Sequence, residues 1–492
     1  MSETALGRRR MSDLENTITA MRARMRVDSG EAAAAARFVY VAAAVYAVLF
    51  AFAAVLHYEV FEMARFDLGN MVQAIWNTLH GHVLQTTLDG HQHNRLGYHV
   101  DPFLVLLAPL ALLSSMPQIL LALQAIAVAS GALPVFWLAR KHLDSPRSGA
   151  LFAVAYLLYP ATQFNADTLG DGFHSVSFAV PLILYAIWFL DEDRLVAFSV
   201  MALLAASTKE EIPLAVGCLG SWYAVRRGRR LFGFSVFAAG LGLTVFNFLW
   251  VIPHFAPKGV TPFADRYTAV GGTPRGIVHK LFTDPAVFVH AVASGHKAGF
   301  VLVLFVPFLA LSLLEPLLLL GAVPDLAVNL LSSNPNQTTI QFQYTAGIIP
   351  FVVAASIFGA ARLKRHRRLD LPLWVCAATA AVAIFSPIYL GVSDVGALGT
   401  PVQAAKEHAV GLIPNAVPVS VSNRLGGHLS ARRLVYTFPA VGQAKWIVVD
   451  VNDLSYGDLK GYRRVVREFE RKKAWRTVFS SHGVTVLHKR SR

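Results

Sequence analysis

Eleven apolar segments run through the first 390 residues of this 492-residue chain, and they restrict its fold more than any other feature. A helix needs about 20 mostly apolar residues, at about 1.5 Å each, to cross the roughly 30 Å hydrocarbon core of a bilayer. With 55% hydrophobic and 15% charged residues and a mean hydropathy of +0.48, the chain is too apolar for a soluble enzyme of its size. We therefore expect an α-helical polytopic membrane protein with about 11 transmembrane helices, at 37–57, 118–138, 149–163, 174–190, 195–208, 212–225, 231–252, 298–314, 316–331, 344–361 and 371–390.

A twelfth apolar segment, 102–114, is too short to be a span. About 13 helical residues reach only about 20 Å, so we place this segment in the interface between membrane and water. The choice decides the topology, because a span there would invert every later loop. The segment follows a long outer loop at 58–101.

Lysines and arginines are distributed unequally between the two predicted sides of the membrane. Residues 1–36 form a basic tail that we place in the cytoplasm, and part of it suits an amphipathic helix on anionic lipid. Twenty basic residues then fall inside: Arg8, Arg9, Arg10, Arg22, Arg24, Arg26, Arg37, Arg140, Lys141, Arg147, Arg194, Arg226, Arg227, Arg229, Arg230, Arg362, Lys364, Arg365, Arg367 and Arg368. Only eight fall in the outer loops of the membrane part: Arg65, Arg95, Lys209, Lys258, Arg266, Arg275, Lys280 and Lys297. This asymmetry predicts a cytoplasmic N-terminus and an extracytoplasmic C-terminus.

The same charge distribution excludes several function classes. The net charge of +14 does not indicate nucleic-acid binding, because the basic residues punctuate apolar runs instead of forming a solvated stripe with aromatic residues. The two cysteines, Cys218 and Cys376, each lie inside an apolar run. They predict neither a disulfide framework nor a zinc cluster.

The last hundred residues, 391–492, have the pattern of a small extracytoplasmic α/β domain. Residues 417–421, 434–438 and 446–451 are typical of strands, whereas 402–410 and 459–472 are typical of helices. Residues 476–479 and 484–488 predict a hairpin across Ser481, His482 and Gly483. The chain thus divides into a tail (1–36), a membrane module (37–390) and this outer domain.

Asp67 is the candidate catalytic residue in the long outer loop. Residues 67–79 predict an amphipathic helix that begins at Asp67. A carboxylate at a helix N-terminus is a common capping group, so one interpretation is purely structural. The other is a general base at the membrane surface beneath an outer cavity.

Further polar residues converge on the outer side of the predicted bundle. Ionisable groups at a membrane boundary are costly, so Lys209, Glu210 and Glu211 are functional candidates as well as a candidate structural ion pair. His91, His93 and His99 are a weak metal motif because they lack a fixed acidic partner. A second outer loop, 253–297, carries Arg266. The candidates for substrate binding are Arg65, His99, Asp101, Asp171, His174, Lys209, Glu210, Arg266, Gln343 and Tyr344.

Several short motifs occur in a distinctive order. They are Arg65-Phe66-Asp67-Leu68-Gly69, Gln73-Ala74-Ile75-Trp76-Asn77, His99-Val100-Asp101-Pro102, Asp171-Gly172-Phe173-His174, Lys209-Glu210-Glu211, Gln341-Phe342-Gln343-Tyr344 and Asn423-Arg424-Leu425. In this order they resemble a bacterial family of multi-span proteins known as domain of unknown function 2079, over roughly residues 37 to 455. That family is similar to the GT-C glycosyltransferases, which use polyprenyl-phosphate sugars.

The resemblance implies a GT-C layout, with an early catalytic aspartate after the first span and a bundle that carries a lipid-donor groove. Asp67 matches the position of that aspartate, and residues 99–102 are similar to the proline-containing motif that opens the interfacial helix. Asp67 has no adjacent second carboxylate of the kind common in protein mannosyltransferases. Gln343-Tyr344 stands where the related pattern has His-Tyr.

The leading hypothesis is a membrane glycosyltransferase that moves a sugar from a polyprenyl-phosphate donor to an extracytoplasmic acceptor. Asp67 would take the proton of the acceptor hydroxyl, and Lys209, Arg266, Arg65 and His99 would neutralise the lipid phosphate. The acceptor would be a cell-envelope glycan, lipid or protein. The protein would be located in the bacterial cytoplasmic membrane. The hypothesis requires no cofactor, and a divalent metal ion is an open alternative. The alternatives are a lipid or solute transporter or flippase, and an inactive scaffold whose outer domain binds a partner.

Overall fold

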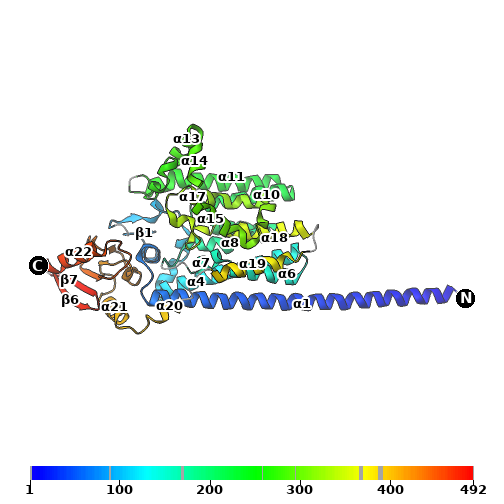
Figure 1. Cartoon of the computed structure of the whole chain (residues 1–492), viewed down its shortest axis with the longest axis horizontal. Coiled ribbons are helices and arrows are strands. Elements are labelled where there is room, and N and C mark those ends of the chain that lie inside the picture. The colour runs from blue at the N-terminus through cyan, green and yellow to red at the C-terminus, as the bar shows by residue number, and fades with distance from the viewer. Residues whose placement is uncertain are drawn as a thin grey trace.

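The computed structural model describes residues 3–87, 90–167, 171–257, 259–293, 295–364, 369–385 and 392–490, with side chains from residue 30 onward except at 384, 385, 392 and 393. Lys258, Arg365, Arg367, Arg368 and the end of the predicted span 371–390 lie outside this part of the chain. The molecule consists of a helical bundle, an outer layer of short helices and loops, and a C-terminal sheet domain (Figure 1).

Within the described residues, each predicted span contains one or more helices. The bundle helices run alongside the long helix α1 (Figure 1). They are α1 (Glu3–Glu59), α4 (Met116–Ser130), α5 (Ala132–His142), α6 (Pro146–Leu158), α7 (Pro160–Ala166), α8 (Ala179–Asp191), α9 (Leu195–Ala206), α10 (Ile212–Arg227), α11 (Arg230–Phe246), α15 (Gly295–Phe305), α16 (Pro316–Leu319), α17 (Val323–Leu331), α18 (Ile349–Lys364) and α19 (Leu371–Phe385). Their apolar side chains share one core, in which Phe136, Tyr156, Trp222 and Phe351 are fully buried.

The helical membrane fold class is therefore confirmed, but the number of spans stays a prediction. Three helices of the described chain are long and apolar enough to cross a membrane: Gly30–Glu59, Met116–His142 and Arg230–Phe255. A fourth span is added if the bent pair Ala286–Val292 and Gly295–Phe308 counts as one. The other apolar helices are shorter, in part because prolines start or interrupt them, as Pro160 and Pro316 do.

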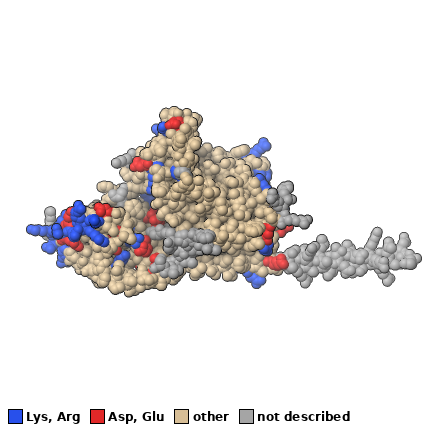
Figure 2. Space-filling model, viewed as in Figure 1, with Lys and Arg blue, Asp and Glu red and all other residues tan. Residues whose placement is uncertain are grey.

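Basic residues that the sequence places on the inner side gather at one end of the bundle, where the N-terminal part of α1 leaves it (Figures 1 and 2). Asp191 is the centre of this end. Lys141 Nζ lies 2.7 Å from Asp191 Oδ2, and Arg227 Nη2 lies 3.8 Å from Asp191 Oδ1. Arg147 pairs with Asp370 at 2.6 Å. The predicted inner loops thus meet in space.

Short elements form the outer layer at the opposite end. The first outer loop contains η1 (Arg65–Gly69), α2 (Asn70–Leu79), β1 (Gln85–Thr86), β2 (His93–Asn94), η2 (Arg95–Gly97), α3 (Phe103–Leu106) and η3 (Ala108–Leu112). As predicted, segment 102–114 forms only two short helices. They pack with α2 in a second apolar core that includes Met71, Ile75 and Leu104.

The second outer loop projects sideways from the bundle. Segments η5 (Asn247–Val251) and α12 (Ile252–Phe255) continue α11 up to this loop, which contains η6 (Ala264–Val270), α13 (Pro274–Thr283) and α14 (Ala286–Val292). Helices α13 and α14 stand away from the bundle (Figure 1). Segments η7 (Val306–Phe308), η8 (Leu311–Leu314), η9 (Leu320–Ala322), η10 (Pro335–Thr338), η11 (Gln343–Thr345) and η4 (Ser175–Phe178) connect the bundle helices.

The C-terminal domain is a three-layer α/β structure. Its strands β3 (Val419–Val421), β4 (Val435–Thr437), β5 (Trp446–Asp450), β6 (Trp475–Ser481) and β7 (Val484–Lys489) form a sheet in the order β4-β3-β5-β7-β6. The first three strands are parallel, and β5, β7 and β6 are antiparallel. Helix α21 (Pro401–Gly411) packs on one face and α22 (Leu459–Arg471) on the other. Segments α20 (Val392–Val395) and η12 (Leu425–Leu429) complete the domain.

The predicted strands and helices of this domain agree with the structure. Successive strand residues face opposite layers: Val448 packs towards α21, whereas Ile447 and Val449 pack towards α22. The predicted hairpin joins β6 to β7 through His482 and Gly483, which have φ values of 48° and 84°. Two positive φ values are what a tight hairpin turn requires.

Candidate active site

Asp67 lies in η1, a single π-helical turn between the bundle and the outer domain. The capping interpretation does not describe it, because α2 begins at Asn70 and its N-cap, Gly69, has no side-chain cap. π-Helical turns are rare and often occur at functional sites. The backbone N–H of Leu68 donates to the carbonyl oxygen of Asp171, 3.1 Å away, and so ties this turn to the loop between α7 and α8.

Asp67, Asp171 and His174 form the centre of the candidate site. His174 Nε2 lies 3.3 Å from Asp67 Oδ1, and one ligand atom from each of the three side chains lies within 4.8 Å of the others. The Asp67 side chain keeps 34% of its surface exposed, whereas that of His174 keeps 4%. The second carboxylate missing beside Asp67 in the sequence is therefore supplied in space by Asp171.

Neighbouring groups fix the orientation of His174. Its backbone N–H donates to Gln124 Oε1, 2.6 Å away, and its ring Nδ1 lies 3.2 Å from the carbonyl oxygen of Gly172. Both ring nitrogens thus lie close to oxygen atoms, which fixes the orientation of the ring. Gly172 has φ of 85°, and a Cβ there would lie 2.9 Å from Leu68 Cβ. Only glycine lets the two loops approach this closely.

The two carboxyl groups have opposite pKa shifts. Burial by itself would raise the pKa of Asp67, but the hydrogen bond and charge of His174, then the charges of Arg95 and His99, hold it below its usual value. Burial, followed by the negative charge of Asp67, raises the pKa of Asp171 to about 7, although His174 acts against this rise. Asp67 is therefore ionised at neutral pH, and Asp171 exchanges its proton near neutrality. Such a divergent pair is typical of acid–base sites.

The same three side chains are the candidate metal ligands. Two carboxylates and one imidazole suit a divalent ion such as Mn²⁺ or Zn²⁺ and would leave some of its coordination positions open. The sequence pointed instead to His91, His93 and His99. In the structure, His93 Nε2 lies 3.0 Å from Thr86 Oγ1 and His99 Nδ1 lies 3.0 Å from Glu210 Oε1, so these two rings serve other contacts.

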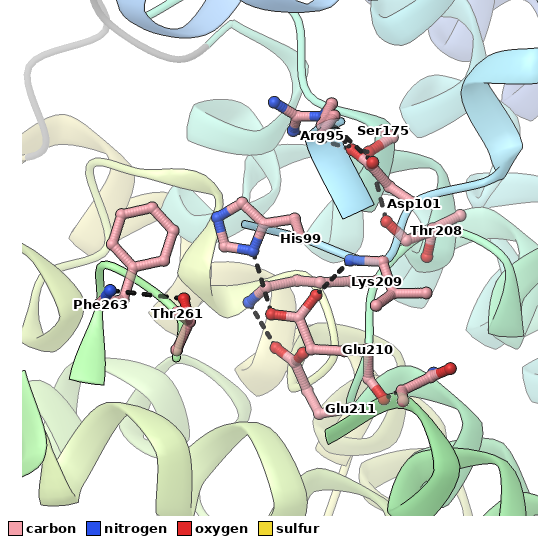
Figure 3. Close-up of polar contacts among 12 residues, drawn as sticks. Arg95, His99, Asp101, Ser175, Thr208, Lys209, Glu210, Glu211, Thr261 and Phe263 are labelled. Carbon is pink, nitrogen blue, oxygen red and sulfur yellow. Dashed lines mark hydrogen bonds and ion pairs between the residues drawn. The ribbon is translucent and has the colours of Figure 1, made fainter. Parts of the chain in front are cut away.

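Two buried ion pairs organise the side of the site shown in Figure 3. Glu210 accepts from His99 and, through Oε2, from the backbone N–H of Val100 at 3.0 Å. Burial alone would raise the pKa of Glu210, but the charge and hydrogen bond of His99, and then Lys209, lower it to about 2. Lys209 contacts Glu211. Burial alone would lower the pKa of Lys209, but the charges of Glu211, Asp325 and Glu210 raise it, so Lys209 stays protonated.

Arg266 and Tyr344 come from distant segments and complete this side. The Arg266 guanidinium lies 4.3 Å from the ring centre of Phe263, and His99 stacks on the same ring at 4.9 Å. Lys209 Nζ lies 5.9 Å from the ring centre of Tyr344. Tyr344 also interacts electrostatically with Arg266 and Asp67. Lys209 and Arg266 therefore form a cationic group on the same side as Asp67, with the His99 ring beside it.

An apolar cavity of about 350 Å³ lies at the second outer loop. Its lining comes from η5, α12, η6 and the start of α13, and includes Phe248, Leu249, Ile252, Val260 and Ala264. Ala264 is adjacent in sequence to Phe263 and belongs to the same short helix as Arg266. The cavity and Arg266 therefore share the helix η6.

Two of the predicted substrate-binding residues are buried in structural contacts. Arg65 was expected to face a donor phosphate, but its side chain is fully buried and bonds to Thr437 and Val435 of the outer domain. Asp101 accepts from Arg95 Nε at 2.8 Å and from Ser175 Oγ at 3.1 Å, and is also buried (Figure 3). Arg65 departs from the expectation because the outer domain folds back over η1, which no local pattern reveals.

The structure brings most of the other predicted residues to the same outer region of the molecule as Asp67, with two additions. Asp171, His174, His99, Glu210, Lys209, Arg266 and Tyr344 converge, and Gln343 directly precedes Tyr344 in η11. The sequence reasoning did not single out Phe263, which links His99 to Arg266, or Gln124, which holds His174. A glutamine inside an otherwise apolar helix was the one available signal for Gln124, because a buried amide needs a partner.

Comparisons with known proteins agree with this architecture. A family model described as a predicted membrane protein (DUF2079) matches residues 57–486. No match is found among curated proteins. The structure of ArnT from Cupriavidus metallidurans bound to undecaprenyl phosphate is similar with a TM-score of 0.50 and 11% identity, over 91% of this chain and 97% of that chain. ArnT from the same organism in the apo state gives a TM-score of 0.47 and 12% identity, over 91% and 98%. The similarity to the bound form confirms the expected GT-C-like fold.

Proposed function

The chain belongs to the DUF2079 family of predicted membrane proteins, and from this premise we propose that it is a glycosyltransferase that uses a polyprenyl-phosphate sugar as donor. The observation that carries the proposal is the placement of Asp67. Its partly exposed carboxylate lies beside Asp171 and His174, on the same side as His99, Lys209 and Arg266. A base and a set of cations are what the transfer of a sugar from a phosphate needs.

In the proposed reaction, the acceptor hydroxyl attacks the anomeric carbon of the donor sugar. The bond from that carbon to the phosphate oxygen breaks, and the polyprenyl phosphate leaves with the electron pair. Asp67 takes the proton of the attacking hydroxyl, and His174 holds the Asp67 carboxylate in place. Lys209, Arg266 and His99 stabilise the negative charge that develops on the phosphate. A divalent ion held by Asp67, Asp171 and His174 would add a further positive charge next to the phosphate.

The lipid part of the donor has a matching apolar surface. The cavity lined by Phe248, Leu249 and Ile252 lies next to the helix that carries Arg266. A polyprenyl chain is apolar and its phosphate is anionic, so the two ends of such a ligand match the cavity and the cations. Undecaprenyl phosphate is the ligand of the similar ArnT structure, which supports this class of donor for the present chain.

The competing hypotheses fit these contacts less well. An inactive scaffold predicts that catalytic carboxylates have been lost, whereas Asp171 provides a second carboxylate beside Asp67. A transporter predicts ionisable groups near the middle of broken spanning helices. Here, Asp191 lies with the basic loops at one end of the bundle, and Asp67 lies in the outer layer at the other. We place the protein in the bacterial cytoplasmic membrane, with its basic tail inside.

The substitution Asp67→Asn tests the proposal with purified protein in lipid nanodiscs. The assay measures release of polyprenyl phosphate from a panel of polyprenyl-phosphate sugars. We expect at least a hundredfold loss of transfer with an unchanged Tm, because the amide keeps the shape of the side chain but cannot take the proton. Asp265→Asn, at an exposed aspartate of η6, is the matched control and should keep full activity. An active Asp67→Asn protein would refute the assignment of the base.

A further inference from the structure

The turn that carries Asp67 is held from outside by the C-terminal domain. The backbone N–H of Arg65 donates to the carbonyl oxygen of Asn423, 2.8 Å away. The N–H of Phe66 donates to Asn423 Oδ1, 3.2 Å away. The first N–H groups of a helix have no partner within the helix. A residue more than 350 positions later in the chain therefore caps η1.

The Arg65 side chain extends this contact into the sheet of the outer domain. Its Nη1 donates to Thr437 Oγ1 at 2.8 Å, and its Nη2 donates to the carbonyl oxygen of Val435. Nη2 also lies 3.3 Å from Gln73 Oε1 on α2. The side chain has no exposed surface. A buried guanidinium that donates to the outer domain fixes η1 relative to β4, because moving either part would leave the charge without its acceptors.

Close packing gives the contact a defined geometry. A Cβ on Gly426 would lie 2.5 Å from the Arg65 Cβ, so only glycine allows η12 to approach η1 this closely. On the opposite side, the N–H of Leu68 is bound to the carbonyl oxygen of Asp171 in the bundle. Asp67 thus lies between a contact to the outer domain, through Arg65 and Phe66, and a contact to the bundle, through Leu68.

We propose that the outer domain is a working part of the active site, in which Arg65, Asn423 and Thr437 are positioning residues that set the place of the Asp67 carboxylate. This inference rests on the proposed function for its kinetic consequence. Its structural consequence, the ordering of residues 65–69 by the outer domain, does not depend on which reaction the protein catalyses.

The test compares Thr437→Val and Arg65→Met with a matched control, Gln403→Ala, in the full-length protein. Thr437→Val removes one acceptor of the Arg65 guanidinium, Thr437 Oγ1, but keeps the shape of β4. Gln403 also bridges the two parts, since its Nε2 donates to the carbonyl oxygen of Glu59 at 3.4 Å, but it lies on α21 and not at η1. Arg65→Lys restores one charged donor and should recover part of any loss.

We expect Thr437→Val to lower kcat about tenfold with the donor KM changed less than twofold, and Arg65→Met to lower it further. A loosened turn moves the Asp67 carboxylate away from His174 but leaves the groups that bind the donor in place, so kcat should fall while KM is kept. Unchanged kcat in Thr437→Val, or an equal change in Gln403→Ala, would overturn the proposal.

Hydrogen exchange separates this proposal from the proposed function. Amides 66–69 should exchange faster in Thr437→Val than in the wild-type protein, while amides of the Gln403→Ala variant keep their wild-type rates there. If the wild-type protein transfers no sugar, the proposed function fails and the exchange result still decides whether the outer domain holds the turn. Unchanged exchange at 66–69 in both Thr437→Val and Arg65→Met would refute that contact role.

The outer domain also has a strongly basic surface far from the bundle, which we consider independently of the contact at η1. Its distal basic face consists of ten exposed basic residues on α22, β6, β7 and the adjoining loops: Lys460, Arg463, Arg464, Arg467, Arg471, Lys472, Lys473, Arg476, Lys489 and Arg490. Figure 2 shows this charge at the end of the molecule farthest from the bundle. The outer-domain ion pairs found in the described chain use Lys406 and Arg424 instead.

We infer that the distal basic face binds a linear polymer of repeated phosphodiester groups without bases, such as a polyol phosphate. Closely spaced arginines match regularly spaced phosphates. Among the described residues 459–490, no phenylalanine, tyrosine or tryptophan is exposed. Single-stranded nucleic acid is bound through stacked aromatic side chains, whereas Phe469 and Phe479 are half-buried against the cores of this domain.

Binding of poly(glycerol phosphate) to the full-length protein in nanodiscs of neutral lipid tests the inference. Affinity should fall steeply with salt, and Arg467→Glu should weaken it about tenfold. Arg194→Glu, an equal charge reversal at an exposed residue of the opposite end, should leave it unchanged. Equal binding by Arg467→Glu would overturn the inference, as would tighter binding of single-stranded DNA or of anionic vesicles.

Discussion

His174 Nε2 lies 3.3 Å from Asp67 Oδ1, while the other ring nitrogen of His174 faces the carbonyl oxygen of Gly172. This contact joins the first outer loop to the loop between α7 and α8. It lowers the pKa of Asp67 against the effect of burial, and it leaves the neighbouring Asp171 as the carboxyl that binds a proton near neutral pH.

Asp171 should make stability depend on pH. Its pKa is about 7 in the folded protein, against about 3.9 for an ordinary aspartate, so between these values the folded protein holds a proton that the unfolded chain has lost. The free energy of unfolding should therefore fall as the pH rises from about 4 to about 7, and level off above. In wild-type protein, Tm should decrease between pH 5 and pH 8 more than in Asp171→Asn. Parallel Tm curves would contradict the shift.

Lys209 should stabilise the fold through its contact with Glu211, whose pKa burial raises to about 8 although the charge of Lys209 acts against this rise. Breaking a buried ion pair from one side typically costs about 3–5 kcal/mol, because the remaining charge loses its partner. Lys209→Met should thus lower Tm strongly, and Lys209→Met combined with Glu211→Gln should recover most of the loss. Thermal unfolding of the three variants in one detergent is the measurement. A double variant as unstable as the single one would show that the pair does not act as a unit.

Arg266 should affect donor binding more than the acid–base step. A hydrogen bond to a charged group contributes about 1.5–3 kcal/mol, which corresponds to roughly a tenfold to hundredfold change. Arg266→Ala should raise the KM for the polyprenyl-phosphate sugar by this factor and leave the pH dependence of kcat unchanged. Arg275→Ala removes an arginine that borders the cavity from α13 and should have a much smaller effect. Equal KM changes in the two variants would remove Arg266 from the phosphate site.

Gly172 should tolerate no side chain. Its φ of 85° and the 2.9 Å approach to Leu68 Cβ both oppose a Cβ, so Gly172→Ala should push the Asp171 loop away from Asp67 and lower activity about tenfold. Gly81 has a similar φ of 81° but no atom within 4 Å of its Cβ position. Gly81→Ala therefore controls for backbone strain alone. A comparable loss of activity in both variants would show that the close approach at Gly172 is unimportant.

The helices and strands could be predicted from the sequence better than the residues of the site around Asp67. The hairpin at His482 and Gly483 could be placed from residue types, since few residues accept positive φ. The π-helical turn at Arg65–Gly69 could not, because it depends on an acceptor from Asn423 in the outer domain. The outer domain also covers the polar face of α2, so polar residues are buried there. Gln73 Nε2, for example, donates to the carbonyl oxygen of Arg433, 3.1 Å away.

By itself, the sequence determined that the chain is an apolar helical bundle with charge gathered at its ends and an α/β domain at its C-terminus. These features depend on periodicity and on the cost of burying charge, which act over a few residues at a time. Only the tertiary structure decided which polar residues form the site. It brought Asp171 beside Asp67 and buried Arg65 against Thr437. Both pairs join segments that are far apart in the chain. Each segment carries a charge or a hydrogen-bond donor that only a partner from the other segment can satisfy.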